Sequence, residues 1–163
     1  KTSLDTNGSM TSIVEDLLTS GLVDHLAIDI KAPLGQPGKY GRVAGIGHNR
    51  ALRAVEAVRS SLSLALEMAP FLEVRTTFVP GLVSRQDVLA IAEELTDMGL
   101  GERPRAYYVL QQFSPKGDLI DPSFAELAQP TPEELFGLAR LVKEQTGLRA
   151  IYVRTQEMGV VKI

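Results

Sequence analysis

The sequence predicts an α/β protein built on a parallel sheet. Segments rich in β-branched and aromatic residues alternate with amphipathic segments along the chain, in the order β-α-β-α-β-α-β-α-β. This order requires right-handed crossovers between parallel strands. Polar residues gather where the strands end, which is where α/β folds place their ligand sites. The pattern leaves open whether the sheet is open or a segment of a (β/α) barrel.

The composition fits a single domain over residues 1–163, with 44% hydrophobic residues and a net charge of −3. No basic stripe suggests a nucleic-acid partner. No apolar run approaches the roughly 20 residues that a membrane span needs. The amino terminus shows no signal region, so we expect a cytoplasmic protein. The chain contains no cysteine and two histidines, which excludes disulfides and thiolate metal sites within it.

The clearest strand runs from Leu26 to Pro33, and it carries charge at its carboxyl end. Side chains alternate along a strand, so Asp29 and Lys31 share one face while Ile28 lies on the other. Charges on a buried strand are costly unless they are paired or used. The predicted strands besides this one are Lys1–Gly8, Phe71–Gly81, Ala106–Phe113 and Arg149–Arg154.

The predicted helices are marked by capping residues and by glycines that follow them. They are Thr11–Ser20, His48–Ser63, Arg85–Met98 and a helix capped by Thr131 that ends near Thr146. Ser84 with Asp87, and Thr131 with Glu134, resemble capping boxes. Between these elements, Pro33–Gly47 is predicted as a loop, either a lid or a mobile segment, and Ser114–Gln129 as an irregular stretch with one helical turn near Phe124.

Parallel strands would bring their polar ends to one mouth. Glu73, Arg75 and Thr77 share one face of the third strand, and the fourth strand ends in the amides Gln111 and Gln112. Such a mouth holds carboxylates and cations together. It suits a zwitterionic ligand, with acids for an ammonium group and with cations and amides for a carboxylate.

Four motifs in order and spacing resemble a known family, the activating enzymes of glycyl radical enzymes in the radical S-adenosylmethionine superfamily. The motifs are Leu4-Asp5-Thr6-Asn7-Gly8, Asp29-Ile30-Lys31, Arg75-Thr76-Thr77-Phe78-Val79-Pro80-Gly81 and Gln111-Gln112-Phe113. The types most similar are the anaerobic ribonucleoside-triphosphate reductase and pyruvate formate-lyase activating proteins. The resemblance extends through Arg154 and implies a glycyl radical enzyme as partner.

That family has a six-stranded partial (β/α) barrel, and this chain resembles its later part, from the third strand onward. The family's cysteine motif for a [4Fe-4S] cluster and its first glycine-rich motif are absent here. The resemblance therefore implies that the cluster belongs to the intact protein and is not ligated by this chain. No catalytic residue is assigned within the chain.

The resemblance also implies a set of residues that bind S-adenosylmethionine. Asp5 and Thr6 would lie beside its methionyl part, and Asp5 with Asp29 matches a monovalent cation site of some relatives. Lys31 would meet the cofactor carboxylate or ribose region, and Arg75 would reach the pocket from its strand. Gln112 or Phe113 falls near a position that contacts ribose. The expected cofactor-binding residues are thus Asp5, Thr6, Asn7, Asp29, Lys31, Arg75 and Gln112.

Several alternatives stay open. Asp5–Gly8 could be only a turn, Asp29 and Lys31 a structural pair, and Arg75 a partner of Glu73. The chain could be a cluster-free ligand-binding or scaffold domain that kept the fold, or a segment of a (β/α) hydrolase or aldolase. We also expect a fragment whose upstream part is missing, and an exposed strand edge at Lys1–Thr6 that favours self-association.

Overall fold

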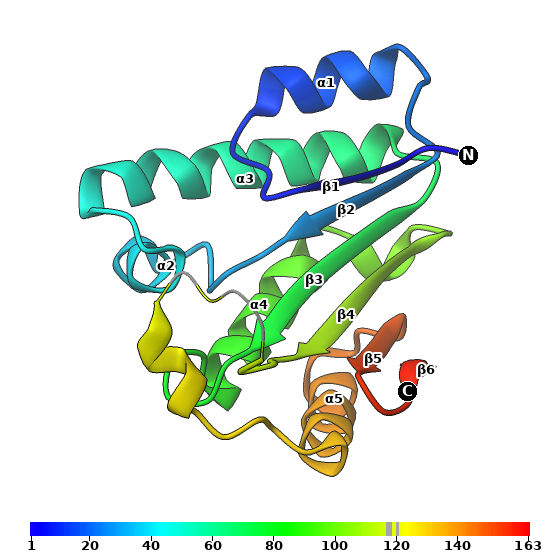
Figure 1. Cartoon of the computed structure of the whole chain (residues 1–163). Helices are drawn as coiled ribbons and strands as arrows, with labels where there is room; N and C mark the ends of the chain where they lie inside the picture. Colours follow the sequence, from blue (N-terminus) through cyan, green and yellow to red (C-terminus); the bar gives the residue numbers. More distant parts are fainter. Residues whose placement is uncertain (117–118, 120) are drawn as a thin grey trace.

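The computed structural model describes residues 1–116, 119 and 121–163 and contains one six-stranded sheet in the order β1-β2-β3-β4-β5-β6 (Figure 1). The strands are β1 (Ser3–Thr6), β2 (His25–Asp29), β3 (Leu72–Phe78), β4 (Ala106–Gln112), β5 (Ile151–Thr155) and β6 (Gly159–Lys162). The first five are parallel, and β6 pairs antiparallel with β5. This confirms the predicted α/β class with a mostly parallel sheet. Within the described residues the sheet is not closed, because β1 and β6 form its two edges.

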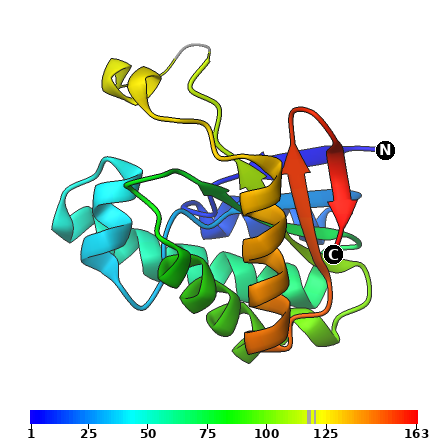
Figure 2. The same ribbon diagram turned by 90° about the horizontal axis from the view of Figure 1, so that it is seen from below.

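Helices cover one side of the sheet and leave the other side open (Figures 1 and 2). They are α1 (Thr11–Thr19), α2 (Pro37–Ala44), α3 (His48–Met68), α4 (Arg85–Asp97) and α5 (Pro132–Thr146), with short 3-10 turns η1 (Leu100–Glu102) and η2 (Pro122–Glu126). Both views show a curved sheet with the helices along its convex side. We call the uncovered side the open face.

The apolar core lies between this sheet and the helices. The strand residues of one parity, among them Leu26, Ile28, Leu72 and Val74, are fully buried against the helices. They pack with helix residues such as Leu62. Because side chains alternate along a strand, the residues of the other parity must face the open side. The apolar pattern therefore fixes which polar side chains reach the open face.

Two helix starts behave as their sequences indicate. In α4 the Ser84 hydroxyl accepts a hydrogen bond from the Asp87 backbone N–H, and the Asp87 carboxylate accepts one from the Ser84 N–H. Thr131 and Glu134 form the same reciprocal arrangement at α5. Each box satisfies backbone donors that a helix would otherwise leave unpaired.

The predicted loop Pro33–Gly47 is wrong, because most of it forms helix α2. Pro37 occupies the first turn, where its missing N–H costs nothing, and Gly45 ends the helix at a φ of 67°. The segment packs against its neighbours in this structure. Tyr40 is 3% exposed, and a Cβ on Gly41 would lie 3.0 Å from the Cβ of Ala51 in α3. The helix is thus seated on the body of the protein.

Some helices and strands also end at residues other than those predicted. Helix α3 continues five residues beyond Ser63, to Met68. A hairpin after β5 was not predicted: the chain turns at Gly159, with a φ of 67°, into β6. The helical turn near Phe124 is confirmed by η2. Residues 117, 118 and 120 of the predicted irregular stretch lie outside the described residues.

Among the described residues, no helix combines the length and the apolar character needed to cross a membrane.

Candidate functional site

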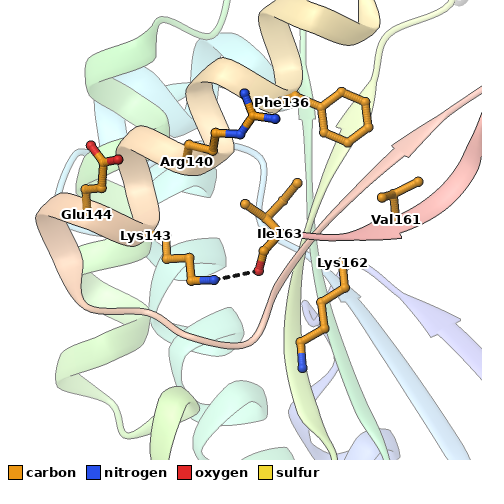
Figure 3. Close-up of a pocket in the computed structure, with 7 residues that line it drawn as sticks. All are labelled: Phe136, Arg140, Lys143, Glu144, Val161, Lys162 and Ile163. Carbon is orange, nitrogen blue, oxygen red and sulfur yellow. Dashed lines mark hydrogen bonds between the residues drawn. The ribbon is translucent and has the colours of Figure 1, made fainter.

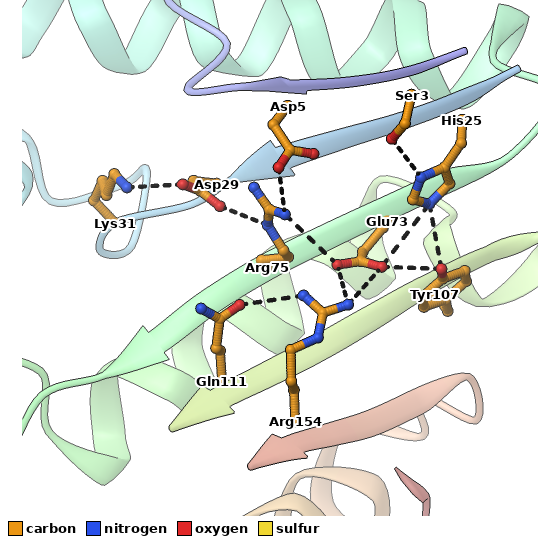
Figure 4. Close-up of polar contacts among 10 residues, drawn as sticks. All are labelled: Ser3, Asp5, His25, Asp29, Lys31, Glu73, Arg75, Tyr107, Gln111 and Arg154. Atoms are coloured by element: carbon orange, nitrogen blue, oxygen red, sulfur yellow. Dashed lines mark hydrogen bonds and ion pairs between the residues drawn. The ribbon is translucent and has the colours of Figure 1, made fainter. Parts of the chain in front are cut away.

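Four of the predicted site residues meet on the open face: Asp5 and Asp29 lie near the carboxyl ends of β1 and β2, Lys31 follows β2, and Arg75 lies in the middle of β3 (Figure 4). Arg75 stands at the centre. Its Nε donates to Asp29 Oδ1 at 2.8 Å, and its Nη1 donates to Asp5 Oδ2 at 3.2 Å. Lys31 Nζ donates to the other oxygen of Asp29 at 3.0 Å. We call Asp5, Asp29, Lys31 and Arg75 the Asp29 cluster.

The sheet register explains why these side chains reach one another. Asp29 and Arg75 are directly opposite on neighbouring strands, so their side chains leave the sheet side by side. Asp5 lies opposite Ala27, one strand further away. The short side chain of Ala27 leaves space above β2, and Arg75 reaches across it to Asp5.

The ion pairs keep the cluster charged although it is partly buried. Burial alone would raise the pKa of Asp29, but the charges and hydrogen bonds of Lys31 and Arg75 outweigh burial and hold that pKa below its ordinary value. Burial opposes the charge of Arg75 as well. Hydrogen bonds to Asp29 and Asp5 outweigh it and raise the pKa of Arg75. The cluster holds two acids and two cations and is neutral overall.

A cavity of about 220 Å³ lies beside the cluster, between the end of β2 and helices α2 and α3. Lys31 and Asn7 contribute polar groups to its wall, and Tyr40 and Val58 contribute apolar surface. Burial, and then the negative charge of Asp29, raise the pKa of Tyr40 to about 12. The Tyr40 hydroxyl thus stays protonated at neutral pH.

Thr6 and Asn7 form a turn next to this cavity. The Thr6 hydroxyl accepts a hydrogen bond from the Gly8 N–H at 3.1 Å, and Asn7 Oδ1 accepts one from the Ser9 N–H at 3.0 Å. Gly8 has a φ of 70°, a conformation that glycine adopts without strain. The motif thus forms a turn, but not only a turn, because the Asp5 carboxylate accepts a hydrogen bond from Arg75. It also places Asn7 on the cavity wall.

Gln112 does not join the Asp29 cluster. It is 6% exposed and has the parity of the core residues Tyr108 and Leu110. Its Nε2 donates to the Pro130 carbonyl at 2.8 Å, and its Oε1 accepts from the Gln156 N–H at 2.9 Å. Gln112 thus ties two loops to β4, and its side chain lies on the helix side of the sheet, away from the Asp29 cluster.

A second group of polar residues lies on the open face. Two of them, Glu73 and Gln111, were predicted at the polar end of the sheet, and the others were not predicted as a site. Glu73 is 3% exposed. Its Oε2 accepts from Tyr107 at 3.0 Å and from Arg154 Nη2 at 3.1 Å. Glu73 Oε1 lies 2.8 Å from the same Nη2, but outside a hydrogen-bonding direction. His25 Nδ1 lies 3.1 Å from the Ser3 hydroxyl and Nε2 lies 3.3 Å from the Tyr107 hydroxyl. Figure 4 shows how these side chains join.

We call this second group, Ser3, His25, Glu73, Tyr107, Gln111 and Arg154, the Glu73 cluster. Arg75 connects it to the first, because Arg75 Nη1 lies 3.9 Å from Glu73 Oε1. Burial, and then the charge of Glu73, raise the pKa of Tyr107 to about 12. Period-two parity had already placed Glu73 on the face of Arg75, and the same signal along β4 could have found Tyr107, which shares that face with Gln111.

The two carboxylates of the expected monovalent cation site are bridged by a guanidinium. Asp5 and Asp29 both accept hydrogen bonds from Arg75, which already supplies a positive charge between them. In the part of the chain that the structure describes, no group of three or more His, Cys, Asp or Glu side chains is arranged to hold a metal ion.

A separate hollow of about 540 Å³ lies between α5 and β6, away from both clusters (Figure 3). Phe136, Val161 and Ile163 line it together with Arg140 and Lys143. Lys143 Nζ donates to the backbone carbonyl of Ile163 at 2.8 Å. None of the residues predicted as a site lies in this hollow.

Comparison with known proteins gives one relative over most of the chain. No family model matches the sequence. A protein of Methanocaldococcus jannaschii described as a "putative glycyl-radical enzyme activating enzyme" is 30% identical over 144 residues, which is 86% of this chain and 54% of the relative. The chain thus spans about half the length of the protein it matches. This similarity supports the activating-enzyme family for the region that the two proteins share.

Proposed function

We propose that this chain is the carboxyl-terminal part of a radical S-adenosylmethionine activating enzyme and that it binds the methionyl end of the cofactor. The intact protein would generate a glycyl radical on a partner of the anaerobic ribonucleotide reductase or pyruvate formate-lyase type. One observation carries the proposal: Asp5, Asp29, Lys31 and Arg75, from three neighbouring strands, converge on the open face beside the carboxyl end of β2. The similarity to an activating enzyme gives this cluster its context.

The charges of the cluster match those of a methionyl group. The ammonium group would take an acid, Asp5 or Asp29, and the carboxylate would take Lys31 or Arg75. In the structure these four side chains pair with one another. A zwitterion can exchange with such pairs without changing the charge of the site, whereas a net anion or cation cannot. The residues therefore fit this part of the cofactor.

The residues do not fit an iron–sulfur cluster. The chain has no cysteine, and thiolates are the usual ligands of such clusters. We therefore assign this chain no part in electron transfer or bond cleavage. Its proposed contribution is to bind and orient the cofactor on one half of a barrel whose earlier strands and cysteines belong to a segment outside residues 1–163.

The lack of cysteine also favours a second candidate, a cluster-free domain that binds a small zwitterion. The two candidate functions predict different behaviour of the intact protein. By intact protein we mean this chain together with any further segments that its gene encodes. Reconstitution with iron and sulfide under anaerobic conditions should give a broad charge-transfer absorbance in the intact protein and none in the chain alone. An intact protein that stays colourless favours the second candidate.

The binding role of Asp29 is tested by titrating S-adenosylmethionine into the intact protein in a calorimeter. We expect Asp29→Asn to weaken binding at least tenfold, about 1.4 kcal/mol, because a charged partner of the zwitterion is removed. Asp16→Asn is the matched control, since Asp16 is exposed on α1, away from the cluster.

The same variants separate binding from folding. If Asp29 is only a structural partner of Lys31 and Arg75, the free energy of unfolding should fall by as much as the free energy of binding. If Asp29 binds the cofactor, affinity should fall much further than stability. Unchanged affinity in Asp29→Asn contradicts the proposal.

A further inference from the structure

A chain of hydrogen bonds crosses the Glu73 cluster from an exposed hydroxyl to a buried acid (Figure 4). Ser3 Oγ lies 3.1 Å from His25 Nδ1, and His25 Nε2 lies 3.3 Å from the Tyr107 hydroxyl. Tyr107 in turn donates to Glu73 Oε2 at 3.0 Å. Ser3 is exposed, whereas the Glu73 side chain is 4% exposed. A serine, an imidazole and a buried carboxylate are thus joined without a break.

The direction of each proton in this chain follows from the buried acid. Glu73 Oε1 lies 2.8 Å from Arg154 Nη2 in an ion pair, and an ionised carboxylate can only accept hydrogen bonds. The single hydroxyl proton of Tyr107 is therefore donated to Glu73. Tyr107 keeps that proton at neutral pH, because burial and the charge of Glu73 raise its pKa to about 12. The Tyr107 oxygen then accepts from His25 Nε2, which leaves Nδ1 as the acceptor that faces Ser3.

This order of protons is the one that activates a hydroxyl group. A serine is a weak nucleophile unless a base within hydrogen-bond reach takes its proton, and a third group must hold that base in the correct tautomer. His25 Nδ1 lies within reach of Ser3 Oγ, and Tyr107 holds the tautomer. Ser3 is directly opposite His25 on the neighbouring strand, so the register keeps the two side chains together. Ser3 thus has the local surroundings of a nucleophile.

Space for a substrate lies next to Ser3. A cavity of about 370 Å³ at the amino ends of β1, β2, β3 and β4 includes Ser3 and His25 in its wall. Pro70 and Phe71 give this cavity apolar surface. Asp24, the acid of the same wall, already accepts a hydrogen bond from the Thr2 N–H at 2.7 Å. The cavity therefore suits a small and largely apolar group.

Arg105 supplies positive charge to this cavity, and its guanidinium carbon lies 5.1 Å from the centre of the Phe71 ring. Its φ is 65°, the one positive value of a non-glycine residue in the part of the chain that the structure describes. Such a conformation costs stability and is often retained at functional sites. Arg105 is exposed and takes part in none of the ion pairs among the described residues. A cation in this cavity favours the negative charge that develops on a carbonyl oxygen under attack.

We propose that Ser3 and His25 form a nucleophile–base pair that hydrolyses small carboxylic esters whose acyl group lies in this cavity. Ser3 Oγ bonds to the ester carbonyl carbon while His25 Nδ1 takes the hydroxyl proton. The bond from that carbon to the alkoxy oxygen then breaks, and His25 returns the proton to the leaving alcohol. Water attacks the acyl group with His25 again as the base, which releases the carboxylic acid and restores Ser3. Tyr107 is a positioning residue in this scheme.

The first test uses diisopropyl fluorophosphate as a probe of the intact protein. Its phosphorus bonds to an activated serine oxygen as fluoride leaves. We expect mass spectrometry to find the added group on Ser3. Ser3→Ala should abolish labelling, and His25→Gln should slow it about a hundredfold, the usual effect of losing a general base. Ser63→Ala and His48→Gln, both exposed on α3, are the matched controls and should label at the wild-type rate.

A second measurement does not depend on whether a variant folds. The ¹⁵N chemical shifts of the His25 ring in the wild-type intact protein should show a proton on Nε2 and none on Nδ1. Tyr107→Phe removes the acceptor of that proton, so the two tautomers should mix. Labelling of Ser3 should then slow about tenfold, because the other tautomer cannot act as the base. A Tyr107 that only fills space would leave the tautomer unchanged.

Hydrolysis of p-nitrophenyl acetate by the same variants should fall in parallel with labelling. The inference is overturned if the probe does not reach Ser3, whether the hydroxyl is not activated or another segment of the intact protein covers it. It is overturned as well if His25→Gln labels at the wild-type rate, if His25 Nδ1 carries the proton, or if a protein that labels at Ser3 hydrolyses no ester.

These outcomes are separate from those that test the proposed function. None of the hydrogen bonds of the Asp29 cluster involves Ser3, so Ser3→Ala should keep the wild-type affinity for S-adenosylmethionine. Asp29→Asn should likewise keep the wild-type rate of labelling at Ser3. If the probe labels Ser3 in a protein that never binds S-adenosylmethionine, only the proposed function fails. If the protein binds S-adenosylmethionine and Ser3 is not labelled, only this inference fails.

Discussion

The two faces of the sheet differ in polarity and burial. The face under the helices is apolar and closed, and Leu26, Leu72 and Val74 on it have no exposed surface. The open face carries Asp29 and Arg75 on the same strands, partly exposed and held by ion pairs. Adjacent residues of one strand, such as Val74 and Arg75, therefore belong to different environments.

This difference explains how a strand can carry charged side chains and still keep its register in the sheet. The apolar face fixes the register, because a shift by one residue would bury charges and expose the core. Fixed register then sets which open-face side chains are opposite, as with Asp29 and Arg75. Shorter apolar side chains on the open face, such as Ala27 and Val109, are buried beneath the longer polar side chains around them. The apolar core thus lies on one face, while the other face carries partly exposed polar side chains.

The largest effect should follow from breaking the closed face. Leu72→Ala removes a fully buried side chain and leaves a cavity, so we expect a loss of about 3 kcal/mol in the free energy of unfolding. Leu22→Ala is the control, because Leu22 is 63% exposed. Urea denaturation followed by circular dichroism measures both. A loss below about 1 kcal/mol for Leu72→Ala would show that this face is not the core.

The two neighbouring amides of β4 give a sharper comparison. Gln112→Leu leaves the Pro130 carbonyl and the Gln156 N–H without their partner, and we expect a cost of about 2 kcal/mol. Gln111→Leu loses only a long bond to Arg154 on the open face and should cost less than about 0.5 kcal/mol.

Urea midpoints of these two variants, measured side by side, test the assignment of the faces. The opposite order of stabilities would mean that Gln111, rather than Gln112, is the structural residue of the pair.

The smallest effect concerns acid stability. The pKa of Asp29 is held low by Lys31 and Arg75 against the effect of burial, and the pKa of Asp87 is held low by Lys39 and Ser84 against the same effect. The folded state therefore binds fewer protons than the unfolded chain near the ordinary carboxyl pKa of about 3.9. These contributions are present above that pH and are lost as the pH falls through the lowered values.

We expect the free energy of unfolding to drop between pH 5 and pH 3, and we expect the drop to shrink in both Asp29→Asn and Asp87→Asn. Denaturation curves at pH 7, 5, 4 and 3 measure it, with Asp16→Asn as the control that keeps the wild-type slope. If only Asp87→Asn changes the dependence of the free energy of unfolding on pH, then the Asp87–Lys39 pair is acid-sensitive and the Asp29 cluster is not.

The sequence by itself determined the α/β class, the alternation of parallel strands with helices along the chain and the members of the Asp29 cluster. Each of these depends on local signals: alternation along a strand, a capping pair, a polar strand end. Thr131 with Glu134 needed no tertiary contact to mark the start of α5. The charges of Asp29 and Lys31 were equally visible, because they break an apolar strand at its carboxyl end.

The tertiary structure decided what local signals could not. Helix α2 has the Pro37 and Gly45 signals of a helix, but its glycines looked like a loop until packing placed Gly41 against Ile46 and Ala51. Gln111 and Gln112 are consecutive in β4, so alternation puts them on opposite faces, but only the packing of the sheet decides which of the two faces the helices. Glu73 meets Arg154 across 81 residues of chain. Such partners are set by which strands are neighbours, and that depends on the packing of the whole sheet.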